Sequence, residues 1–374
     1  MTTRVLTVLG TRPEATKMAP VIQVLSRAPG FEARLCITAQ HRQMLDQILE
    51  LFNIRPDYDL NLMRDDQSLS ELSAAAFSGL DAVFTEAQPD WILVQGDTTT
   101  VAIASILAYY RRIKVGHVEA GLRTGNKWSP FPEEINRRIA GVVADLHFAP
   151  TNWARHNLLR EGVESEAIFV TGNPAIDAVQ YIAAQPEPEE ARTLLAPLAL
   201  GQRRLILVTA HRRESFGEPF RNICRAIRTI ASRPDAEVIY PVHLNPNVQE
   251  PVQAILQGVP HVTLLPPLSY LTLVHPMKHA HLILTDSGGI QEEAAAMGVP
   301  ALVMREVTER PEGIEAGALK LVGTTEARIV AETARLLDDR DAHAAMARAG
   351  NPFGDGQAAQ RIVDVLRNTA ERSA

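Results

Sequence analysis

The sequence is poor in cysteine and lacks long apolar runs. Its two cysteines, Cys36 and Cys224, each stand in an apolar, regular-looking stretch of a chain of 374 residues. We expect two buried, reduced thiols, because a chain of this length needs no covalent staple or metal clip. No segment approaches the ~20 apolar residues of a membrane span, and the apolar run before Thr11 is too short for a signal peptide. We therefore expect a cytoplasmic protein.

The sequence also lacks an excess of positive charge. Lys and Arg number 37 against 44 Asp and Glu, which gives a net charge of −7. Simple solubility is the plainer explanation of that balance. An acidic protein repels nucleic acid and anionic membranes on average, so we expect neither as a partner, and a bound phosphate has to be held by locally placed cations.

What the sequence does contain is an alternation of short β-branched runs and amphipathic helical stretches. Such alternation predicts an α/β protein, and the length predicts two domains, each a doubly wound, Rossmann-like parallel sheet, facing each other across a cleft. The segment 185–204, rich in proline and acids, interrupts the pattern as a linker or as an exposed helix and loop. The expected strands are 4–10, 34–39, 91–96, 114–120, 204–210, 237–242, 262–265, 281–285 and 300–305.

Polar clusters follow most of these strands directly. They read GTRPE, AQH, GDTTT, HVEAGLRT, TAHRRE, PVHLNP and TDSGG in chain order. Ligands of open α/β sheets bind outside the carboxyl ends of the strands. Seven such clusters, spread over both halves of the chain, predict one composite site in the cleft.

The cluster around Ser287 has the features of a phosphate site. Gly288 and Gly289 let a ligand approach the backbone, and the N–H groups at a helix start face an anion. Glu293, one helical turn further on, is suited to accept the two hydroxyls of a ribose. The alternative is a plain strand–helix turn whose acids favour the helix dipole, because the pattern is neither GxGxxG nor a Walker motif.

Charged side chains supply the other candidate groups. Arg12 and Lys17 lie around the start of the first helix, where cations oppose the macrodipole unless a phosphate or carboxylates offset them. The alternative for both is ordinary solvation at the surface. The segment 308–317 is a polar loop followed by glycines, as expected of a loop that closes over a ligand.

Three acids and a histidine are the candidates for proton transfer. A group of carboxylates in a cleft raises the pKa of some members, which suits proton transfer to and from carbon, although oxygen ligands of this kind also hold magnesium. A histidine that ends a strand in an HRRE run is more often functional than structural. The residues are Asp97, Glu119, Glu133 and His211.

Taken in order, the motifs resemble those of the non-hydrolysing bacterial UDP-N-acetylglucosamine 2-epimerases. The motifs are GTRPEATKMAP, TAQHRQM, GDTTT, HVEAGLRTGNKWSPFPEEINR, HRRE, PVHLNP, DSGGIQEE and TERPEGIEAG, and the resemblance runs from Val5 to about Gly356. It implies the GT-B architecture, with Rossmann-like domains at 1–170 and 171–354. The last helix, at about 355–374, would return to the first domain. The resemblance further implies a homodimer.

The resemblance also implies roles for individual residues. Asp97, Glu119 and Glu133 match the catalytic acids of the family, and His211 matches its catalytic histidine. Matching basic residues of the active site are Arg12 and Lys17. The matching UDP site is formed by Ser287, Gly288, Gly289, Glu293 and Arg12. A second UDP-N-acetylglucosamine, bound as an activator, would contact Gln40, Gln43, Gln67, Arg212 and His243.

Two positions depart from the family pattern. Ser215 stands where many members have asparagine, and it keeps a hydroxyl for hydrogen bonding. Leu273 stands where an aromatic side chain often packs near the uracil, which removes one stacking face.

The activity implied is reversible inversion of C2 in UDP-N-acetylglucosamine, without a redox cofactor or a metal. The C2 proton is not next to a carbonyl, so we expect anti elimination of UDP to 2-acetamidoglucal and re-addition from the other face. Cations and helix-start amides would stabilise the departing diphosphate. The alternatives are a GT-B glycosyltransferase, a hydrolysing epimerase, and a nucleotide-sugar sensor, in which clustered acids would only repel the ligand.

Overall fold

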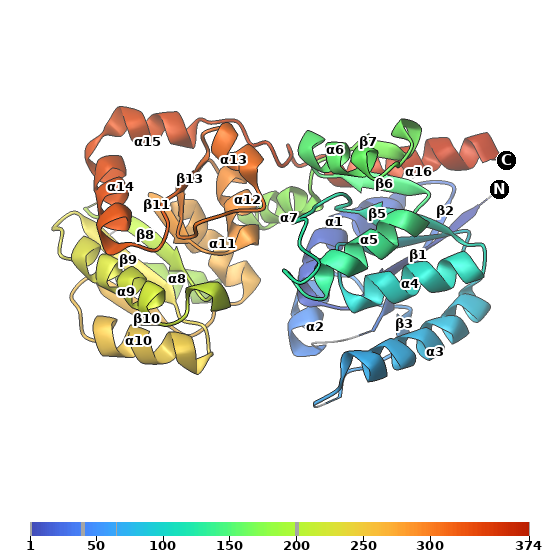
Figure 1. Ribbon diagram of the computed structural model, residues 1–374, viewed down its shortest axis with the longest axis horizontal. Coiled ribbons are helices and arrows are strands. Elements are labelled where there is room, and N and C mark those ends of the chain that lie inside the picture. The colour runs from blue at the N-terminus through green and yellow to red at the C-terminus, as the bar shows by residue number, and fades with distance from the viewer. Residues whose placement is uncertain (1, 39–41, 65, 199–201, 374) are drawn as a thin grey trace. The chain divides into compact units, whose positions relative to one another are not determined.

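The computed structural model describes residues 2–38, 42–64, 66–198 and 202–373, whose helices and strands are labelled in Figure 1. The chain forms two compact units, one made of Met1–Ala178 with Phe353–Ala374 and the other of Val179–Pro352. The sequence predicts a boundary near residue 170, and the contacts divide the chain after Ala178, within helix α7 (Pro174–Ala183). The last helix, α16 (Ala358–Ser373), belongs to the first unit and packs on its first helix.

The first unit contains a seven-stranded sheet in which all strands are parallel. Its order is β3-β2-β1-β4-β5-β6-β7, so the direction of winding reverses between β1 and β4. Ligands of such sheets bind at the carboxyl ends beside this reversal. The strands are β1 (Thr3–Leu9), β2 (Phe31–Ile37), β3 (Tyr58–Asp59), β4 (Trp91–Gln95), β5 (Lys114–Val118), β6 (Leu146–Ala149) and β7 (Ile168–Val170).

Helices cover both faces of this sheet. One layer contains α1 (Arg12–Arg27), α2 (Arg42–Leu51) and α16, and the other contains α3 (Leu69–Ala87), α4 (Thr99–Tyr110) and α5 (Glu133–Val143). The remaining helical elements are α6 (Asn152–Arg160), a short 3₁₀ turn at Ser165–Ala167, and α7. Because the strands are covered on both sides, every residue of β4 is buried.

Local sequence explains where these helices begin. Ser68 caps α3 in a reciprocal capping box with Glu71, and Thr98 accepts a hydrogen bond from the N–H of Val101 at the start of α4. Apolar side chains of α3 and α4, such as Phe84 and Leu107, then pack on the sheet. Each such burial contributes about 1.5–3 kcal/mol.

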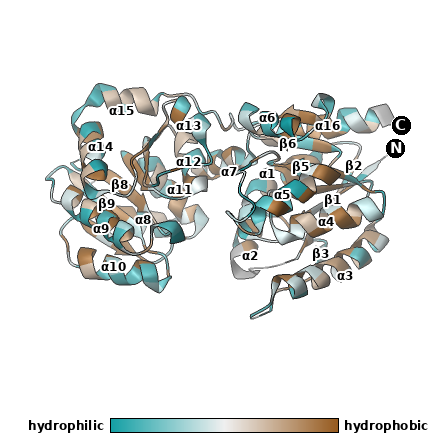
Figure 2. Ribbon diagram, in the orientation of Figure 1, coloured by the Kyte–Doolittle hydropathy of each residue, from teal (hydrophilic) through white to brown (hydrophobic). Residues whose placement is uncertain are grey.

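The second unit contains a six-stranded parallel sheet of the same winding, in the order β10-β9-β8-β11-β12-β13. The reversal here lies between β8 and β11. The strands are β8 (Arg204–Thr209), β9 (Ala236–Pro241), β10 (Val262–Leu265), β11 (Leu282–Thr285), β12 (Ala301–Val303) and β13 (Leu319–Leu321). Figure 2 shows the strands largely in the colours of apolar residues, while the helices carry both colours.

Helices again form two layers. One contains α9 (Glu218–Ala231), α10 (Pro246–Leu256) and α14 (Glu326–Asp338), and the other contains α8 (Glu189–Leu195), α11 (Tyr270–His279), α12 (Gly288–Ala296) and α13 (Pro311–Glu315). A 3₁₀ turn at Arg213–Ser215 and helix α15 (Arg340–Ala347) complete the unit. The core below α9 gathers Phe220, Ile227 and Tyr240 with the strands.

The predicted α/β class, with two Rossmann-like doubly wound domains, is confirmed, and each predicted strand overlaps an observed one. Strands β3, β6, β7 and β13, of two to four residues each, were not among the predicted strands. The segment after β12 is not wholly a loop, because α13 forms within it. Cys36 and Cys224 are both buried and unpaired, as expected. No helix among the described residues is long and apolar enough to cross a membrane.

Candidate active site

The polar clusters of the first unit meet at the carboxyl ends of three neighbouring strands. Arg12 and Lys17 lie on α1, which follows β1, while Asp97 follows β4 and Glu119 follows β5. Since β1 pairs with β4 and β4 with β5, the three turns are adjacent, as the sequence predicts. The turns of β1 and β4 flank the reversal of the sheet.

Glu119 is the most firmly held of the predicted acids. It is 7% exposed, and each of its carboxylate oxygens lies 2.7 Å from Nζ of Lys17. The side-chain amide of Gln95 also donates to this carboxylate, and Asn173 Nδ2 donates to its Oε1 at 2.9 Å. The residue adopts a left-handed backbone conformation, with φ 59°. Its carboxylate is thus a fixed anion with a set orientation.

Asp97 is held by a different cation. Arg137 on α5 donates to its carboxylate, and the same guanidinium lies 3.3 Å from an oxygen of Glu134. Glu134 is fully buried and also accepts hydrogen bonds at 3.1 Å from the N–H groups of Thr124 and Gly125. A chain of alternating charges therefore ties Asp97 to the loop before α5.

Glu133 and Arg12 remain open to a ligand. The Oε2 atom of Glu133 is buried without a hydrogen-bond partner, at the first residue of α5. Among the described residues, no acceptor is within bonding distance of the Arg12 guanidinium, which is half-buried at the start of α1. A carboxylate oxygen and a cation without partners are groups that an incoming ligand can satisfy.

The structure adds an acid that sequence reasoning did not single out. Glu14 on α1 is 2% exposed, and its carboxyl accepts bonds from the N–H of Gly10, the hydroxyl of Thr11 and the hydroxyl of Thr98, at 3.1, 2.7 and 3.0 Å. Burial raises its pKa to about 7, although these bonds act in the opposite direction. Glu14 thereby joins the turn after β1 to the turn after β4.

His117 supports the same region from within β5. Its Nε2 lies 2.7 Å from the carbonyl oxygen of Gly96, the residue before Asp97. Burial lowers the pKa of His117 to about 4, so the ring is neutral near pH 7 and Nε2 donates to the carbonyl. The turn that carries Asp97 is thus held on two sides. Thr98 caps the start of α4, and His117 of β5 bonds to Gly96.

In the second unit, His211 follows β8 and faces Asp286, which follows β11. The carboxylate of Asp286 accepts the backbone N–H groups of His211 and Arg212 at 2.7 and 2.8 Å, and its other oxygen lies 3.8 Å from His211 Nδ1. Burial lowers the pKa of His211 and raises that of Asp286, so desolvation favours the neutral form of both groups. An anion bound near His211 would favour its charged form.

The start of α12 has the predicted form of an anion site. Ser287 occupies the N-cap without a side-chain cap bond, and a Cβ at Gly288 would lie 2.6 Å from Nη1 of Arg310. Arg310 in turn donates from Nε to Glu292 at 2.7 Å. Helix-start amides and a guanidinium therefore converge on one place, which suits a phosphate. Gly289 lies in the same first turn.

Glu293 lies one turn into α12, as predicted. It is 7% exposed, and the hydroxyl of Tyr270 donates to its Oε1 at 2.9 Å. Tyr270 begins α11, on which Leu273 also lies. Tyr270 therefore brings an aromatic side chain against Glu293, the predicted ribose-binding acid. It lies on the same helix as Leu273, the position at which the family pattern often has an aromatic residue.

The segment after β12 is braced by a buried arginine. Arg305 is 4% exposed and donates to Glu214 at 2.6 Å and to Glu309 at 2.8 and 3.1 Å. Burial raises the pKa of Glu309, but the bonds and charge of Arg305 outweigh it and lower this pKa to about 2. The segment is therefore tied to the HRRE turn after β8.

The residues predicted to bind a second nucleotide sugar are only partly accounted for. Gln40 lies outside the described residues, as does the side chain of Gln43, whose backbone is in α2. Gln67 precedes the cap of α3, with its Oε1 buried and lacking a hydrogen-bond partner. In the second unit, the ring of His243 stacks on that of His211, with centroids 5.2 Å apart and planes at 14°. Arg212 adjoins His211, and its Nε is buried without a partner.

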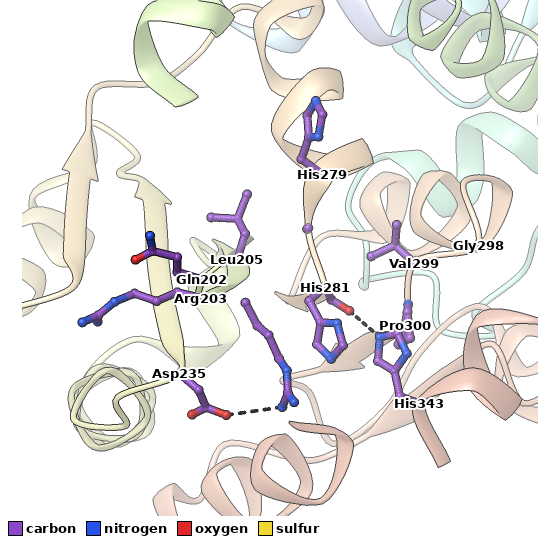
Figure 3. Close-up of a pocket in the computed structure, with 12 residues that line it drawn as sticks. Gln202, Arg203, Leu205, Asp235, His279, His281, Gly298, Val299, Pro300 and His343 are labelled. Atoms are coloured by element: carbon purple, nitrogen blue, oxygen red, sulfur yellow. Dashed lines mark hydrogen bonds and ion pairs between the residues drawn. The ribbon is translucent and has the colours of Figure 1, made fainter. Parts of the chain in front are cut away.

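A cavity of about 630 Å³ lies in the second unit, at the amino ends of the strands (Figure 3). Its lining includes residues that precede strands β8, β9, β11 and β12, among them Arg203, Asp235 and His281. The rings of His281 and His343 stack there, 3.8 Å apart. None of the predicted site residues lines it. Its position at the amino ends of the strands separates it from the candidate active site.

Several supporting residues gave no separate signal in the sequence. Gln95 lies inside a strand, Asn173 in a short Gly-Asn-Pro turn and Arg137 within a helix, so each resembled an ordinary structural residue. Glu14 was part of a quoted motif, but only its burial distinguishes it. Asp286 was visible in the TDSGG cluster. Among the described residues, no three His, Cys, Asp or Glu side chains are arranged to hold a metal ion.

The fold and these strand-end clusters define an α/β protein with two Rossmann-like domains and a helix start whose geometry suits an anion. The family model described as UDP-N-acetylglucosamine 2-epimerase matches residues 23–367. The chain is 54% identical over 370 residues to the UDP-N-acetylglucosamine 2-epimerase of Escherichia coli K12, with 98% of each chain covered. This protein therefore belongs to the UDP-N-acetylglucosamine 2-epimerase family.

Solved structures agree with that assignment. The UDP-N-acetylglucosamine 2-epimerase of Neisseria meningitidis, solved with UDP-N-acetylglucosamine, is 46% identical at a TM-score of 0.91, covering 98% of this chain and 100% of its own. The enzyme of Methanocaldococcus jannaschii, in complex with UDP-N-acetylglucosamine and UDP, is 33% identical at a TM-score of 0.80 and covers 98% and 99%.

Proposed function

We propose that this protein interconverts UDP-N-acetylglucosamine and UDP-N-acetylmannosamine by inverting C2 of the amino sugar. The observation that carries the proposal is that Arg12, Asp97 and the fixed carboxylate of Glu119 follow three neighbouring strands, β1, β4 and β5, at the carboxyl ends of the first sheet. Relatives that match nearly the full chain are named UDP-N-acetylglucosamine 2-epimerases, and two of them were solved with UDP-N-acetylglucosamine.

The proposed chemistry is an anti elimination followed by re-addition. A carboxylate removes the C2 proton as the bond from C1 to the diphosphate oxygen breaks, which gives 2-acetamidoglucal and UDP. UDP then returns to C1 while an acid delivers a proton to the other face of C2. The carboxylates of Asp97, Glu119 and Glu133 supply base and acid, because proton transfer needs such groups within reach of carbon.

The negative charge that develops on UDP needs cations and dipoles. The guanidinium of Arg12, which has no acceptor within bonding distance among the described residues, would interact with this charge. Lys17 and His211 are the further candidates. The N–H groups at the start of α12, with Ser287, Gly288 and Gly289, would hold the diphosphate, and Glu293 the ribose. The chemistry uses no metal and no redox cofactor.

A regulatory site and a dimer belong to the same proposal. A second UDP-N-acetylglucosamine, held by Gln40, Gln43, Gln67, Arg212 and His243, would activate the enzyme. The stacking of His243 on His211 offers a direct route to a catalytic group.

The proposed homodimer would form through an exposed apolar surface of the first unit. Tyr109 and Tyr110 of α4 and Val142 of α5 are 67%, 68% and 87% exposed, on helices that pack together. Light scattering of the purified protein tests the dimer.

Product analysis tests the activity. The pure protein is incubated with UDP-N-acetylglucosamine alone, with and without EDTA, and the products are identified by NMR. We expect UDP-N-acetylmannosamine at the same rate in both samples. Free N-acetylmannosamine would indicate a hydrolysing epimerase. Unchanged substrate would indicate a sensor, or a transferase that lacks its acceptor. Activity that is lost in EDTA and restored by magnesium would indicate a metal enzyme.

A further inference from the structure

The chain passes between the two units twice, and within the first unit the two passages lie against each other. The first passage leaves through Gly172, Asn173 and α7, and the second enters at Phe353 and Gly354. The N–H of Asn173 donates to the carbonyl oxygen of Phe353 at 2.7 Å, and a Cβ at Gly172 would lie 3.1 Å from Cα of Gly354. Backbone packed this closely leaves little freedom for one passage to move without the other.

A second contact joins the same passages. The carboxylate of Asp177 on α7 accepts the N–H groups of Ala358 and Ala359 at 3.2 and 2.9 Å. These groups open α16, and a carboxylate at a helix start is favoured by the free amides there. The passages are thus joined at Asn173 and again one helical turn further along.

Asn173 is the residue at which this junction reaches the candidate active site. It is 1% exposed, its Oδ1 accepts the N–H of Ala175 at 3.1 Å, and its Nδ2 donates to Glu119 at 2.9 Å. The backbone donor of Ala175 decides which end of the amide is the oxygen, so the NH₂ group has to face the carboxylate. One buried side chain therefore binds the start of α7 and Glu119, while its own N–H binds the second passage.

We propose that Asn173 is a positioning residue that fixes the Glu119 carboxylate relative to the two chain passages. The inference rests on the proposed function, in which Glu119 takes part in proton transfer at C2. Lys17 and Gln95 also hold the carboxylate, but they come from α1 and β4, within the core of the first unit. Through Asn173, a change in either passage can reach Glu119.

The expected consequence is a loss of turnover rather than of substrate binding. Reacting groups have to be aligned to within a fraction of an ångström, and a displacement of about 1 Å costs about a hundredfold in rate. Neither Asn173 nor Glu119 belongs to the proposed UDP site of the second unit, so KM for UDP-N-acetylglucosamine should change by less than about threefold. A residue with a structural role alone would lower stability and leave kcat in the folded fraction unchanged.

Two substitutions at Asn173 separate these roles. Asn173→Asp keeps the acceptor for the N–H of Ala175 and the backbone bond to Phe353, but places an oxygen against Glu119. Asn173→Ser keeps a hydroxyl that can accept from the same N–H and does not reach Glu119. We expect kcat to fall about a hundredfold or more in the first variant and at least tenfold in the second, with cooperative thermal unfolding retained in both.

A matched pair of glycine variants tests the link to the passages without touching Asn173. Gly172 and Gly162 share φ 87°, so alanine strains the backbone equally at both positions. A Cβ at Gly162 meets nothing within 4 Å, whereas one at Gly172 meets the second passage. We expect Gly172→Ala to lower kcat at least tenfold at unchanged KM, and Gly162→Ala to keep the wild-type kcat.

The outcomes separate the inference from the function on which it rests. A wild-type protein that does not epimerise UDP-N-acetylglucosamine overturns the proposed function. An active wild type with folded Asn173→Asp and Asn173→Ser variants at near wild-type kcat overturns the inference alone. If neither Asn173 variant folds, the glycine pair decides, and equal kcat values for Gly172→Ala and Gly162→Ala overturn it.

Discussion

The acids of the first unit differ most in what surrounds them. Glu119 accepts from a lysine and from two side-chain amides, Asp97 accepts from an arginine, and Glu14 is buried among neutral donors. The position of Asp97 and Glu119 at the carboxyl ends of strands was predictable, because each lies in a polar cluster that directly follows a predicted strand. It could not reveal that Glu14 is buried, since burial depends on how α1 packs over the ends of β1 and β4.

Asp97 carries the residue-scale prediction for catalysis. Asp97→Asn keeps the size of the side chain but removes its charge and its ability to take a proton. We expect kcat and solvent deuterium incorporation at C2 to fall together by about 10²–10⁴-fold, with UDP affinity within about threefold. NMR in D₂O and calorimetry with UDP provide the two measurements.

A matched control exists on the surface of the same unit. Asp81 is paired with Arg111 at 2.6 Å on α3, away from the strand ends, so Asp81→Asn makes the same chemical change outside the site. It should retain wild-type turnover. Near-normal turnover in Asp97→Asn would remove that acid from the mechanism.

Glu14 carries a prediction about stability and pH. Its pKa is about 7 in the folded protein against an ordinary value of 4.5, so between these values the folded state binds more protons than the unfolded state. The stability contributed by this group is therefore complete below pH 4.5 and is lost as the pH rises toward 7. A glutamine at this position cannot titrate.

We expect the stability of Glu14→Gln relative to wild type to rise between pH 4.5 and 7.5 by about 2–3 kcal/mol. Urea unfolding at several pH values measures this difference. The amide side chain of this variant would keep an acceptor for Gly10 and Thr11 and a polar group beside Thr98, so the fold should persist. A difference that stays constant with pH would contradict the burial argument.

At the scale of elements, nine strands and most of their polar ends were predictable, and four short strands were not. Strands such as β4 and β11 carry enough β-branched and apolar residues to be identified. β3 has two residues and β13 has three, so tertiary pairing rather than local preference defines them. Helix α13 was likewise missed, because five residues around Pro311 and Gly313 give little helical periodicity.

The start of α12 supplies the prediction at this scale. A methyl group at Gly288 would lie 2.6 Å from the guanidinium of Arg310, which must then shift from its place at the helix start. We expect Gly288→Ala to weaken UDP binding about tenfold, about 1.4 kcal/mol, by calorimetry. Gly350→Ala is the control, since a Cβ there meets nothing within 4 Å. Equal affinities in the two variants would show that this turn does not hold the diphosphate.

For the whole molecule, two doubly wound units of the same strand order were predictable from alternation and length. The supporting residues were not, because Asn173 and Gln95 become informative only when distant segments are brought together. The passage of α16 back to the first unit was expected from the family resemblance rather than from any pattern in the helix itself.

Regulation is the whole-molecule prediction. An effector acts through its preference for one state, so a second nucleotide sugar that favours the active state should make the forward rate sigmoidal in UDP-N-acetylglucosamine. The reverse reaction from UDP-N-acetylmannosamine alone should start slowly and accelerate when UDP-N-acetylglucosamine is added. Replacing Gln43 and His243 by alanine should reduce both effects, with less damage to UDP binding. Hyperbolic forward kinetics with an immediate full-rate reverse reaction would leave the enzyme unregulated.

The central claim is that C2 is inverted while the bond between C1 and the diphosphate is broken. UDP-N-acetylglucosamine labelled with ¹⁸O at the oxygen between C1 and phosphorus, incubated with the enzyme in D₂O, tests both parts in one sample. Elimination predicts that the label moves to non-bridging positions of the β-phosphate, seen by ³¹P NMR, while deuterium enters C2 of the product. UDP-N-acetylmannosamine that forms with all of its ¹⁸O still in the bridge would contradict the account.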